Sequence, residues 1–370
     1  MTVEVDFSLL DVTRQVPVDD NDAYLRAALA WHFGAETGSA FWLRIAPTLG
    51  FDPLTEVTSY ADLARFPNVL AELRTVPVAD LVPRGYGTPP PVPQIFESGG
   101  TTGAPKRTVQ LPDWIAQTIE WHTDDWTSSG YVRGRGLLGV MPSGPHGVGY
   151  FARLVSAGLG SVFHTVDLDP RWVKRLAARE AAAEVAAYVS HLVEQVGYVL
   201  QTQDVANLLT TPPLLQQIVR RDDLLKLVRS KIGYVVLSGA SIDVDTLDLL
   251  RAMLPATTIT MTYGSTMILS QTHTRPESPD SPAFESFVFD PRSPYVHFRV
   301  IDPATGEPVP YGERGQVVMN HISKGMFLPN NLERDTAIRV PGPPGQVGDS
   351  VTEIAPVAAF EGEPVIEGVY

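Results

Sequence analysis

The sequence predicts a mixed α/β protein, in which a mainly parallel, helix-covered sheet precedes a small antiparallel β-barrel. Between about residues 111 and 263, short apolar runs alternate with helical segments. Such alternation is typical of parallel sheets that are covered on both faces. From about residue 284, the segments SFVFDP, YVHFRVID and GQVVMN are separated by Pro/Gly turns with no helix between them. This change of texture predicts antiparallel strands.

The first 90 residues predict a helical and loop-rich segment that packs on the body. An Asp/Asn cluster provides N-cap candidates for a helix at 19–33, where Leu25, Leu29 and Phe33 recur at helical spacing. The remaining features are a loop-rich stretch at 50–87, a short helix at 59–66 and a Pro-rich connector at 85–93.

Residues 91–280 predict the α/β body, and residues 281–370 predict the barrel-like unit. Gln94–Glu97 leads into a Gly/Thr loop, and beyond it apolar runs between Gly, Pro and polar residues predict strands at 137–141, 161–166, 205–209, 234–238 and 258–263. Cap and periodicity signals predict helices at 111–129, 147–158 and 243–254, one from Asp169-Pro170 to about residue 184, and one beginning at Thr211-Pro212. Asp124 and Asp125 are expected on a solvated helix face.

Composition excludes several classes of function. The chain has 370 residues, room for about two or three packed units. It has 28 basic and 42 acidic residues, so its net charge of −14 argues against nucleic acid and anionic membranes as partners. Without cysteine it can form no disulfide, thiolate metal site or acyl-cysteine intermediate. Neither a secretory signal nor an apolar run of about 18 residues is found, so we expect a cytoplasmic protein.

The segment with the clearest chemical potential is ESGGTTGAPK at 97–106. Its three glycines let the backbone approach a ligand closely, while its hydroxyl groups and Lys106 suit a polyphosphate. The spacing is not that of a Walker motif, because Ala104 or Pro105 stands where the second glycine belongs. Taken alone, the segment is equally compatible with a flexible surface loop.

Further segments, in the same order, resemble the adenylate-forming superfamily of acyl-CoA synthetases, peptide-synthetase adenylation domains and luciferases. SGGTTGAPK resembles the phosphate loop of that superfamily. SGAS at 238–241, YGST at 263–266, the turn-rich segment at 302–315 and GD at 348–349 resemble its later motifs. The segment at 50–67 is most similar to the phenylacetate–CoA ligase branch, and within it the chain resembles the adenylating enzymes of phenazine antibiotic (griseoluteate) biosynthesis.

The resemblance implies roles for individual residues. It implies that Thr266 binds the α-phosphate of ATP and that Lys106 acts on the β- and γ-phosphates. The other residues implied to bind the nucleotide are Ser98, Gly99, Gly100, Thr101, Thr102, Gly103, Gly239, Ala240, Ser241, Tyr263, Gly264 and Ser265.

Two further roles have alternatives. The resemblance implies that Asp349 accepts the ribose hydroxyls, with Asp335 of LERDTAIR as a rival that we rank second. It also implies that His146 lies beside the acyl carboxylate, whereas a hydrogen-bonded loop histidine explains this residue equally well.

The sequence departs from the superfamily pattern at three places. Met267 stands where a Glu usually helps to hold Mg²⁺, and a thioether is a poor ligand for this hard cation. The ligands of any bound Mg²⁺ would then be the nucleotide phosphates, water or another carboxylate. Only 21 residues follow Asp349, so we expect the small C-terminal domain of the superfamily, with its catalytic Lys, to be absent. Gly368-Val369 replaces the usual Gly-Arg of the hinge.

The expected function is ATP-dependent activation of an aromatic carboxylic acid as an acyl-adenylate, with a phenazine carboxylic acid as the narrower expectation. A partner would then use the adenylate for reduction or for amide or thioester formation. Two alternatives stay open: a non-catalytic protein that binds an aromatic acid, and an enzyme completed by a C-terminal domain in trans.

Overall fold

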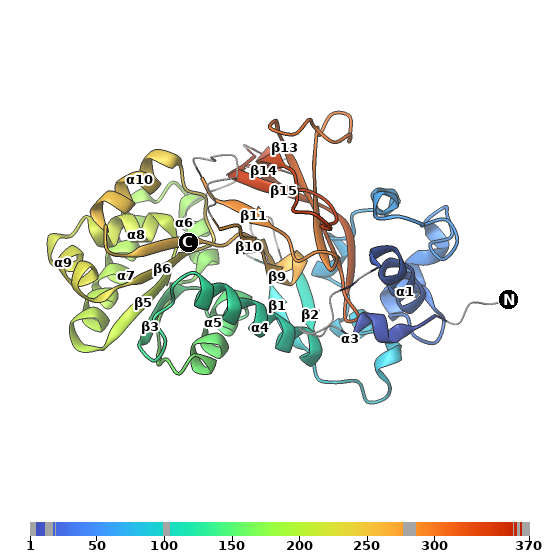
Figure 1. Ribbon diagram of the computed structural model, residues 1–370, viewed down its shortest axis with the longest axis horizontal. Helices are drawn as coiled ribbons and strands as arrows, with labels where there is room; N and C mark the ends of the chain where they lie inside the picture. The colour runs from blue at the N-terminus through green and yellow to red at the C-terminus, as the bar shows by residue number, and fades with distance from the viewer. Residues whose placement is uncertain are drawn as a thin grey trace.

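A computed structural model describes residues 5–11, 18, 20–98, 104–276, 286–357, 359, 360, 363 and 364. Figure 1 shows three regions along the longest axis: the N-terminal segment at one end, a helix-covered parallel sheet at the other, and an antiparallel sheet between them. This arrangement confirms the predicted fold class.

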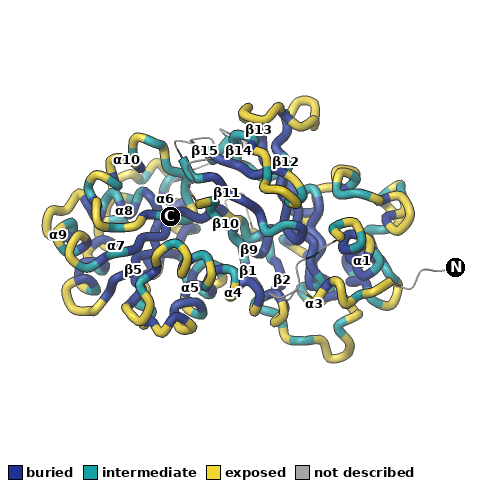
Figure 2. Tube along the Cα trace, viewed as in Figure 1, coloured by how far each residue is buried: buried dark blue, intermediate teal, exposed yellow. Residues whose placement is uncertain are grey.

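The parallel sheet has the strand order β4-β3-β5-β6-β7, and every neighbouring pair in it is parallel. Every residue of the three central strands β3, β5 and β6 is buried, which Figure 2 shows in dark blue, and this explains why their apolar runs predicted them closely. They are β3 (Gly136–Met141), β4 (Phe163–Asp167), β5 (Val205–Thr210), β6 (Tyr234–Leu237) and β7 (Thr258–Met261).

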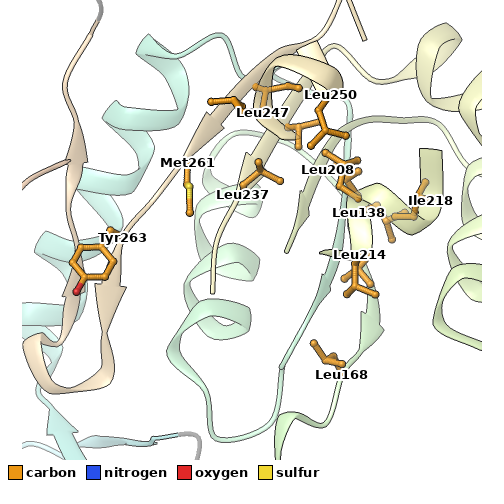
Figure 3. Packing of buried hydrophobic residues seen from close by; sticks show 14 of the residues in the cluster. Leu138, Leu168, Leu208, Leu214, Ile218, Leu237, Leu247, Leu250, Met261 and Tyr263 are labelled. Atoms are coloured by element: carbon orange, nitrogen blue, oxygen red, sulfur yellow. The ribbon is translucent and has the colours of Figure 1, made fainter. Parts of the chain in front are cut away.

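Alternate strand residues pack against two different sets of helices. Leu137 and Leu209 face α4 (Pro112–Ser128) and α5 (Gly147–Gly158), whereas Leu138 and Leu208 face the opposite layer. That layer contains α6 (Pro170–Ala177), α7 (Ala182–Thr202), α8 (Pro212–Val219), α9 (Asp222–Lys231) and α10 (Val244–Met253). Figure 3 shows leucines of the strands packed against side chains of α8 and α10. None of the described helices is long and apolar enough to cross a membrane.

Two helical segments differ from the sequence prediction. The helix that begins at Asp169-Pro170 ends at Ala177, because Glu180 adopts a left-handed conformation with φ of +56°, and α7 then runs to Thr202. The helix that begins after Thr211 ends at Val219, and a second helix, α9, which the sequence did not predict, precedes β6. Helix periodicity marks the apolar faces but not these short interruptions.

The antiparallel sheet contains six strands in the order β10-β11-β15-β14-β13-β12. These strands are β10 (His273–Thr274), β11 (Val288–Asp290), β12 (Val296–Ile301), β13 (Arg314–Ile322), β14 (Phe327–Val340) and β15 (Ser350–Pro356). Three short pairs lie outside it: β1 (Gln94–Glu97) with β2 (Arg107–Gln110), β8 (Gly264–Ser265) with β9 (Ser270–Gln271), and β16 (Ala359–Phe360) with β17 (Glu363–Pro364). The predicted division at 90 and 280 stays a prediction, although β10 precedes residue 281.

The N-terminal segment packs on the turn between β13 and β14. It contains α1 (Asn21–Phe33), α2 (Ala40–Ile45), α3 (Val78–Leu81) and 3₁₀ turns at Phe7–Leu10, Ala46–Thr48, Tyr60–Arg65, Glu72–Arg74 and Arg84–Tyr86. A further 3₁₀ turn, Thr266–Ile268, lies in the body. Aromatic side chains of α1 and α2 form one buried cluster with Phe327 and Leu328 of β14. Trp42 donates a hydrogen bond from Nε1 to the carbonyl of Phe327 at 2.9 Å, which fixes the two regions together.

Four buried histidines make stability depend on pH. Burial lowers the pKa of His32 and His122 to about 4 and that of His297 and His321 to about 3. An unfolded histidine takes up a proton near pH 6.5, so the stabilisation is complete above that pH and is lost as the pH falls toward 4. The free energy of unfolding in urea should fall by about 1 kcal/mol per histidine for each pH unit below about 6.

The matched variants for this prediction are His297→Leu and His191→Gln. Neither ring nitrogen of His297 has a hydrogen-bond partner among the described residues, so His297→Leu should remove about one quarter of the slope. His191 is exposed on α7, and His191→Gln should leave the slope unchanged. A flat profile between pH 7 and 5, or an unchanged slope in His297→Leu, contradicts the prediction.

Candidate functional site

A cavity of about 220 Å³ lies at the carboxyl ends of three parallel strands. In open α/β sheets this edge is where ligands usually bind. The residues that line it come from the ends of β3, β5 and β6, from α4 and α5, and from the segment 264–271. The cavity is therefore built from segments that are far apart in the sequence.

Burial differs between the two sides of this cavity. Gly239 and Gly264 are exposed and His146 is half-buried, so these residues form an open mouth. Trp126 and Leu209 are buried and form a closed end. The remaining closed-end residues are apolar or aromatic for the most part: His122, Met141, Phe151, Ala152 and Val236. An apolar closed end with a polar mouth suits a small molecule that has one charged end.

The ends of the Gly/Thr segment are held together beside the mouth. The backbone N–H of Ser98 donates to the carbonyl of Lys106 at 3.0 Å, and the N–H of Lys106 donates to Ser98 Oγ at 3.0 Å. The residues between them that we predict to bind phosphate, Gly99, Gly100, Thr101, Thr102 and Gly103, lie outside the described residues. The β1–β2 pair thus brings both ends of the segment to one place.

Glu97 anchors this hairpin to α6. Its carboxylate accepts hydrogen bonds from Arg107 at 2.9 Å and from Arg171 at 2.6 Å. Burial opposes ionisation of Glu97, but these two guanidinium groups outweigh it and hold the pKa of the carboxyl below its usual value. Arg171 also donates to the carbonyl of Ser98 at 3.4 Å. The sequence did not single out Glu97 or Arg171, because α6 is remote from β1 along the chain.

Several predicted nucleotide residues meet at the mouth. Gly239 adopts a φ of +83°, which favours glycine, and lines the cavity together with Gly264, Ser265 and Thr266. A Cβ on Gly264 would lie 2.7 Å from the carbonyl oxygen of Ser270, so the β8–β9 pair leaves no room for a side chain there. Ala240 and Ser241 follow Gly239 but do not line the cavity.

Tyr263 and Asp335 face each other, whereas Asp349 lies elsewhere. Tyr263 is 9% exposed, packs against Phe289, and donates its hydroxyl to Asp335 Oδ2 at 3.0 Å. Asp349 is 4% exposed, and its two carboxylate oxygens accept from Arg339 Nε at 2.9 Å and from the N–H of Val300 at 3.2 Å. Neither carboxylate lines the cavity: Asp349 is paired inside the antiparallel sheet, whereas Asp335 pairs with Tyr263 next to Gly264 of the mouth, so the ranking of Asp349 above Asp335 stays a prediction.

Met267 does not face a metal site. Its side chain is 3% exposed and belongs to the apolar cluster that also contains Trp114 and Phe327. The carboxylate of Glu333 contacts this segment, because it accepts a hydrogen bond from Ser265 Oγ at 3.0 Å. Burial and the neighbouring Asp335 raise the pKa of Glu333. Among the described residues, no group of three or more His, Asp or Glu side chains is placed to hold a metal ion.

His146 lies at the mouth, and its predicted place beside the acyl carboxylate stays a prediction. It precedes α5 and lines the cavity, and the preceding carbonyl of Pro145 accepts the N–H of Glu97 at 2.8 Å. Burial lowers the pKa of His146, and Arg171 acts in the same direction, so its imidazole is neutral at pH 7. A neutral ring can donate one hydrogen bond to a carboxylate without adding a charge.

Two further groups near the cavity were not predicted. His122 and Gln110 line it, and Gln110 donates from Nε2 to the carbonyl of Leu269 at 3.2 Å. Asp125 is not solvated as expected, because it pairs with Arg292 and accepts from His273 Nδ1 at 2.8 Å. The helical spacing of His122 and Trp126 could have indicated a shared face, but not that this face lines a cavity.

Comparisons with known proteins support the fold. No protein-family profile matches the sequence, and no curated protein is significantly similar to it. A crystal structure of 2-hydroxyisobutyryl-CoA ligase in the postadenylation state, with R3-HIB-AMP, matches 98% of this chain and 76% of that one at 16% identity and a TM-score of 0.56. An open conformation of this ligase, with 2-HIB-AMP and CoA, matches 98% of this chain and 84% of that one at 18% identity and a TM-score of 0.55.

A third structure is an ATP-bound RpMatB–BxBclM chimera. This chain spans about half (48%) of the chimera's length, with a TM-score of 0.47. The two ligase structures superpose on nearly all of this chain, which includes both its parallel and its antiparallel sheet. The chain therefore has the fold of the large domain of adenylate-forming enzymes.

The close approach at Gly264 yields a stability prediction. Gly264→Ala should lower the free energy of unfolding by about 1–3 kcal/mol, because the added methyl group meets the backbone of Ser270. Gly144→Ala is the matched control near the mouth, since a Cβ there meets no heavy atom within 4 Å. Chemical denaturation of both variants measures the difference. Equal stabilities of the two variants would show that the β8–β9 pair is less constrained than its geometry indicates.

Proposed function

We propose that this protein activates an aromatic carboxylic acid with ATP and forms an acyl-adenylate. The observation that carries the proposal is the single cavity that joins Gly239, Gly264 and Thr266 to His146 and to an apolar closed end. The fold shared with two adenylate-bound CoA ligase structures agrees with this function. We propose more narrowly that this acid is a phenazine carboxylic acid, and this narrower proposal rests on sequence resemblance.

In the proposed reaction, a carboxylate oxygen of the acid attacks the α-phosphorus of ATP. The new P–O bond forms as the bond to the bridging oxygen breaks, and pyrophosphate leaves with the electron pair. Thr266 would donate to an α-phosphate oxygen at the mouth, and Lys106 would stabilise the leaving pyrophosphate. Preorganised donors of this kind supply much of the rate enhancement in such reactions.

The remaining residues would bind and orient the two substrates. Neutral His146 would hydrogen-bond the carboxylate without neutralising its nucleophilic oxygen. Tyr263, packed beside the mouth, would contact the adenine, and Asp335 would accept the ribose hydroxyls. Met267 does not fit a Mg²⁺ site, so any Mg²⁺ would be held by the nucleotide phosphates, water and another carboxylate.

The closed end supports an aromatic acid. Phe151, Trp126 and His122 contribute rings, and their faces suit a flat substrate. The adenylate would then pass to a partner that supplies a reductant, an amine or a thiol. The aromatic skeleton of the acid and the partner that accepts its acyl group are both part of this proposal.

Acid-dependent ATP–pyrophosphate exchange is the direct test. Aromatic acids, phenazine carboxylic acids among them, are supplied with ATP, Mg²⁺ and labelled pyrophosphate, and label should enter ATP only when the correct acid is present. Lys106→Ala should reduce exchange by about 10²–10³ without abolishing acid binding. Acid binding without exchange, for every acid tried, would overturn the proposal.

A second candidate function is a protein that binds an aromatic acid without activating it. The burial of Met267 in an apolar cluster favours it, because no carboxylate stands at this position for metal-dependent chemistry. Calorimetry with ATP separates the two functions, since a binding-only protein has no need of the nucleotide. ATP affinity in the micromolar range would favour the enzyme.

Asp335 and Asp349 give a matched pair of variants. Asp335→Asn should weaken ATP binding by about 10–100-fold, because a charge-assisted hydrogen bond to the ribose is lost. Asp349→Asn should leave ATP binding unchanged and lower the free energy of unfolding by about 1–3 kcal/mol, because it weakens the contact with Arg339. Calorimetry and chemical denaturation of both variants measure these effects, and the opposite pattern would restore Asp349 as the ribose residue.

A further inference from the structure

We propose that the acid carries a neutral hydrogen-bonding substituent, such as a hydroxyl group, an amino group or a ring nitrogen, remote from its carboxyl, and that His122 recognises it. This inference rests on the proposed function, because it concerns the acid in the same cavity. It narrows the substrate class from aromatic acids to aromatic acids with a second polar group.

The position of His122 is the first step. It lies on α4 one helical turn before Trp126, and both side chains line the closed end of the cavity. His122 is 4% exposed, and its ring lies 5.8 Å from that of Phe151. With the carboxyl group of the acid at His146 by the mouth, the opposite end of the acid would meet His122.

The hydrogen-bonding capacity of His122 is the second step. Its ring makes no hydrogen bond with the described residues, although a neutral imidazole offers one donor and one acceptor. Two of the other buried histidines differ: His32 bonds to the carbonyl of Ser323 at 2.7 Å, and His321 bonds to that of Ile268 at 2.7 Å, whereas His297 has no partner among the described residues but does not line the cavity. Those two rings are used by the fold, whereas that of His122 is available to a ligand.

Other polar atoms around the cavity agree with this assignment. Gln110 Oε1, Trp126 Nε1 and Thr210 Oγ1 are buried and have no hydrogen-bond partner among the described residues. A buried polar group without a partner costs about 1–3 kcal/mol. A purely hydrocarbon acid would seal His122 in an apolar site, whereas a polar substituent would offset part of this cost.

The surrounding charges indicate a neutral substituent. Asp125 and Arg292 are the charged groups next to His122, and they pair with each other. Burial lowers the pKa of His122 to about 4, so it supplies no positive charge at pH 7. A second carboxylate at this end would therefore be buried without a counter-charge, which is strongly unfavourable.

The test compares matched pairs of aromatic acids by calorimetry. Naphthoic acids are compared with their hydroxylated analogues and with quinoline carboxylic acids, which replace one ring CH by nitrogen. The wild-type protein should bind the best substituted acid about tenfold more tightly than its hydrocarbon counterpart. Naphthalene dicarboxylic acids, which carry a second charge, should bind more weakly than either.

Three variants assign this preference to His122. His122→Phe keeps a ring of similar shape and should remove the preference, with affinity for the hydrocarbon acid unchanged or higher. His122→Asn keeps a donor and an acceptor, so it should retain part of the preference for substituted acids. This variant also tests the role of His122 if His122→Phe folds poorly. His164→Phe is the control, since His164 is half-buried on β4 and does not line the cavity.

The outcomes separate this inference from the proposed function. An absence of preference in every pair, or a preference that survives in His122→Phe, overturns the inference even if pyrophosphate exchange is observed. A preference that depends on His122 without any exchange supports the inference and overturns the proposed activation. If no aromatic acid binds, both are overturned.

Discussion

Buried backbone carbonyl groups at chain reversals need hydrogen-bond donors, and in this protein side chains from distant elements supply them. The β13–β14 turn is the clearest case, because its carbonyls cannot all be paired within the sheet. Side chains of the N-terminal segment donate to them: Tyr24 to Ile322 at 2.9 Å, Trp31 to Lys324 at 2.9 Å, His32 to Ser323 at 2.7 Å and Trp42 to Phe327 at 2.9 Å. These bonds make the N-terminal segment an integral part of the fold.

The same constraint shapes the wall of the cavity. Leu269 adopts a left-handed conformation with φ of +55°, and its carbonyl accepts Gln110 Nε2 at 3.2 Å and Trp114 Nε1 at 2.8 Å. The carbonyl of Ile268 accepts His321 Nδ1 at 2.7 Å. A strained backbone persists only where its surroundings hold it, and such sites cluster around ligands. The segment that presents Gly264 to Thr266 at the mouth is therefore fixed from the body and from the antiparallel sheet.

Local signals in the sequence were sufficient for the fold but only for part of the site. Apolar runs such as 234–238 and caps such as Asp169-Pro170 act within a few residues, so they predicted β6 and the start of α6 closely. A motif does not reveal the tertiary partners of Asp349 and Asp335, because Arg339 pairs with Asp349 and Tyr263 donates to Asp335 from distant segments. The sequence did not indicate His122 and wrongly placed Asp125 on a solvated face, because the surroundings of both depend on tertiary neighbours rather than on spacing.

Charge at the mouth follows from these placements. A nucleotide would bring several negative charges to a place where Glu97, Glu333 and Asp335 already stand, within a chain of net charge −14. Arg107 and Arg171 neutralise Glu97 by direct pairing. Burial and Asp335 raise the pKa of Glu333, and the nearby ammonium group of Lys106 acts against that rise. A polyphosphate at Lys106 would offset the effect of this ammonium group and raise the pKa of Glu333 further, because added negative charge favours protonation of Glu333. Nucleotide binding at this mouth should therefore be coupled to proton uptake.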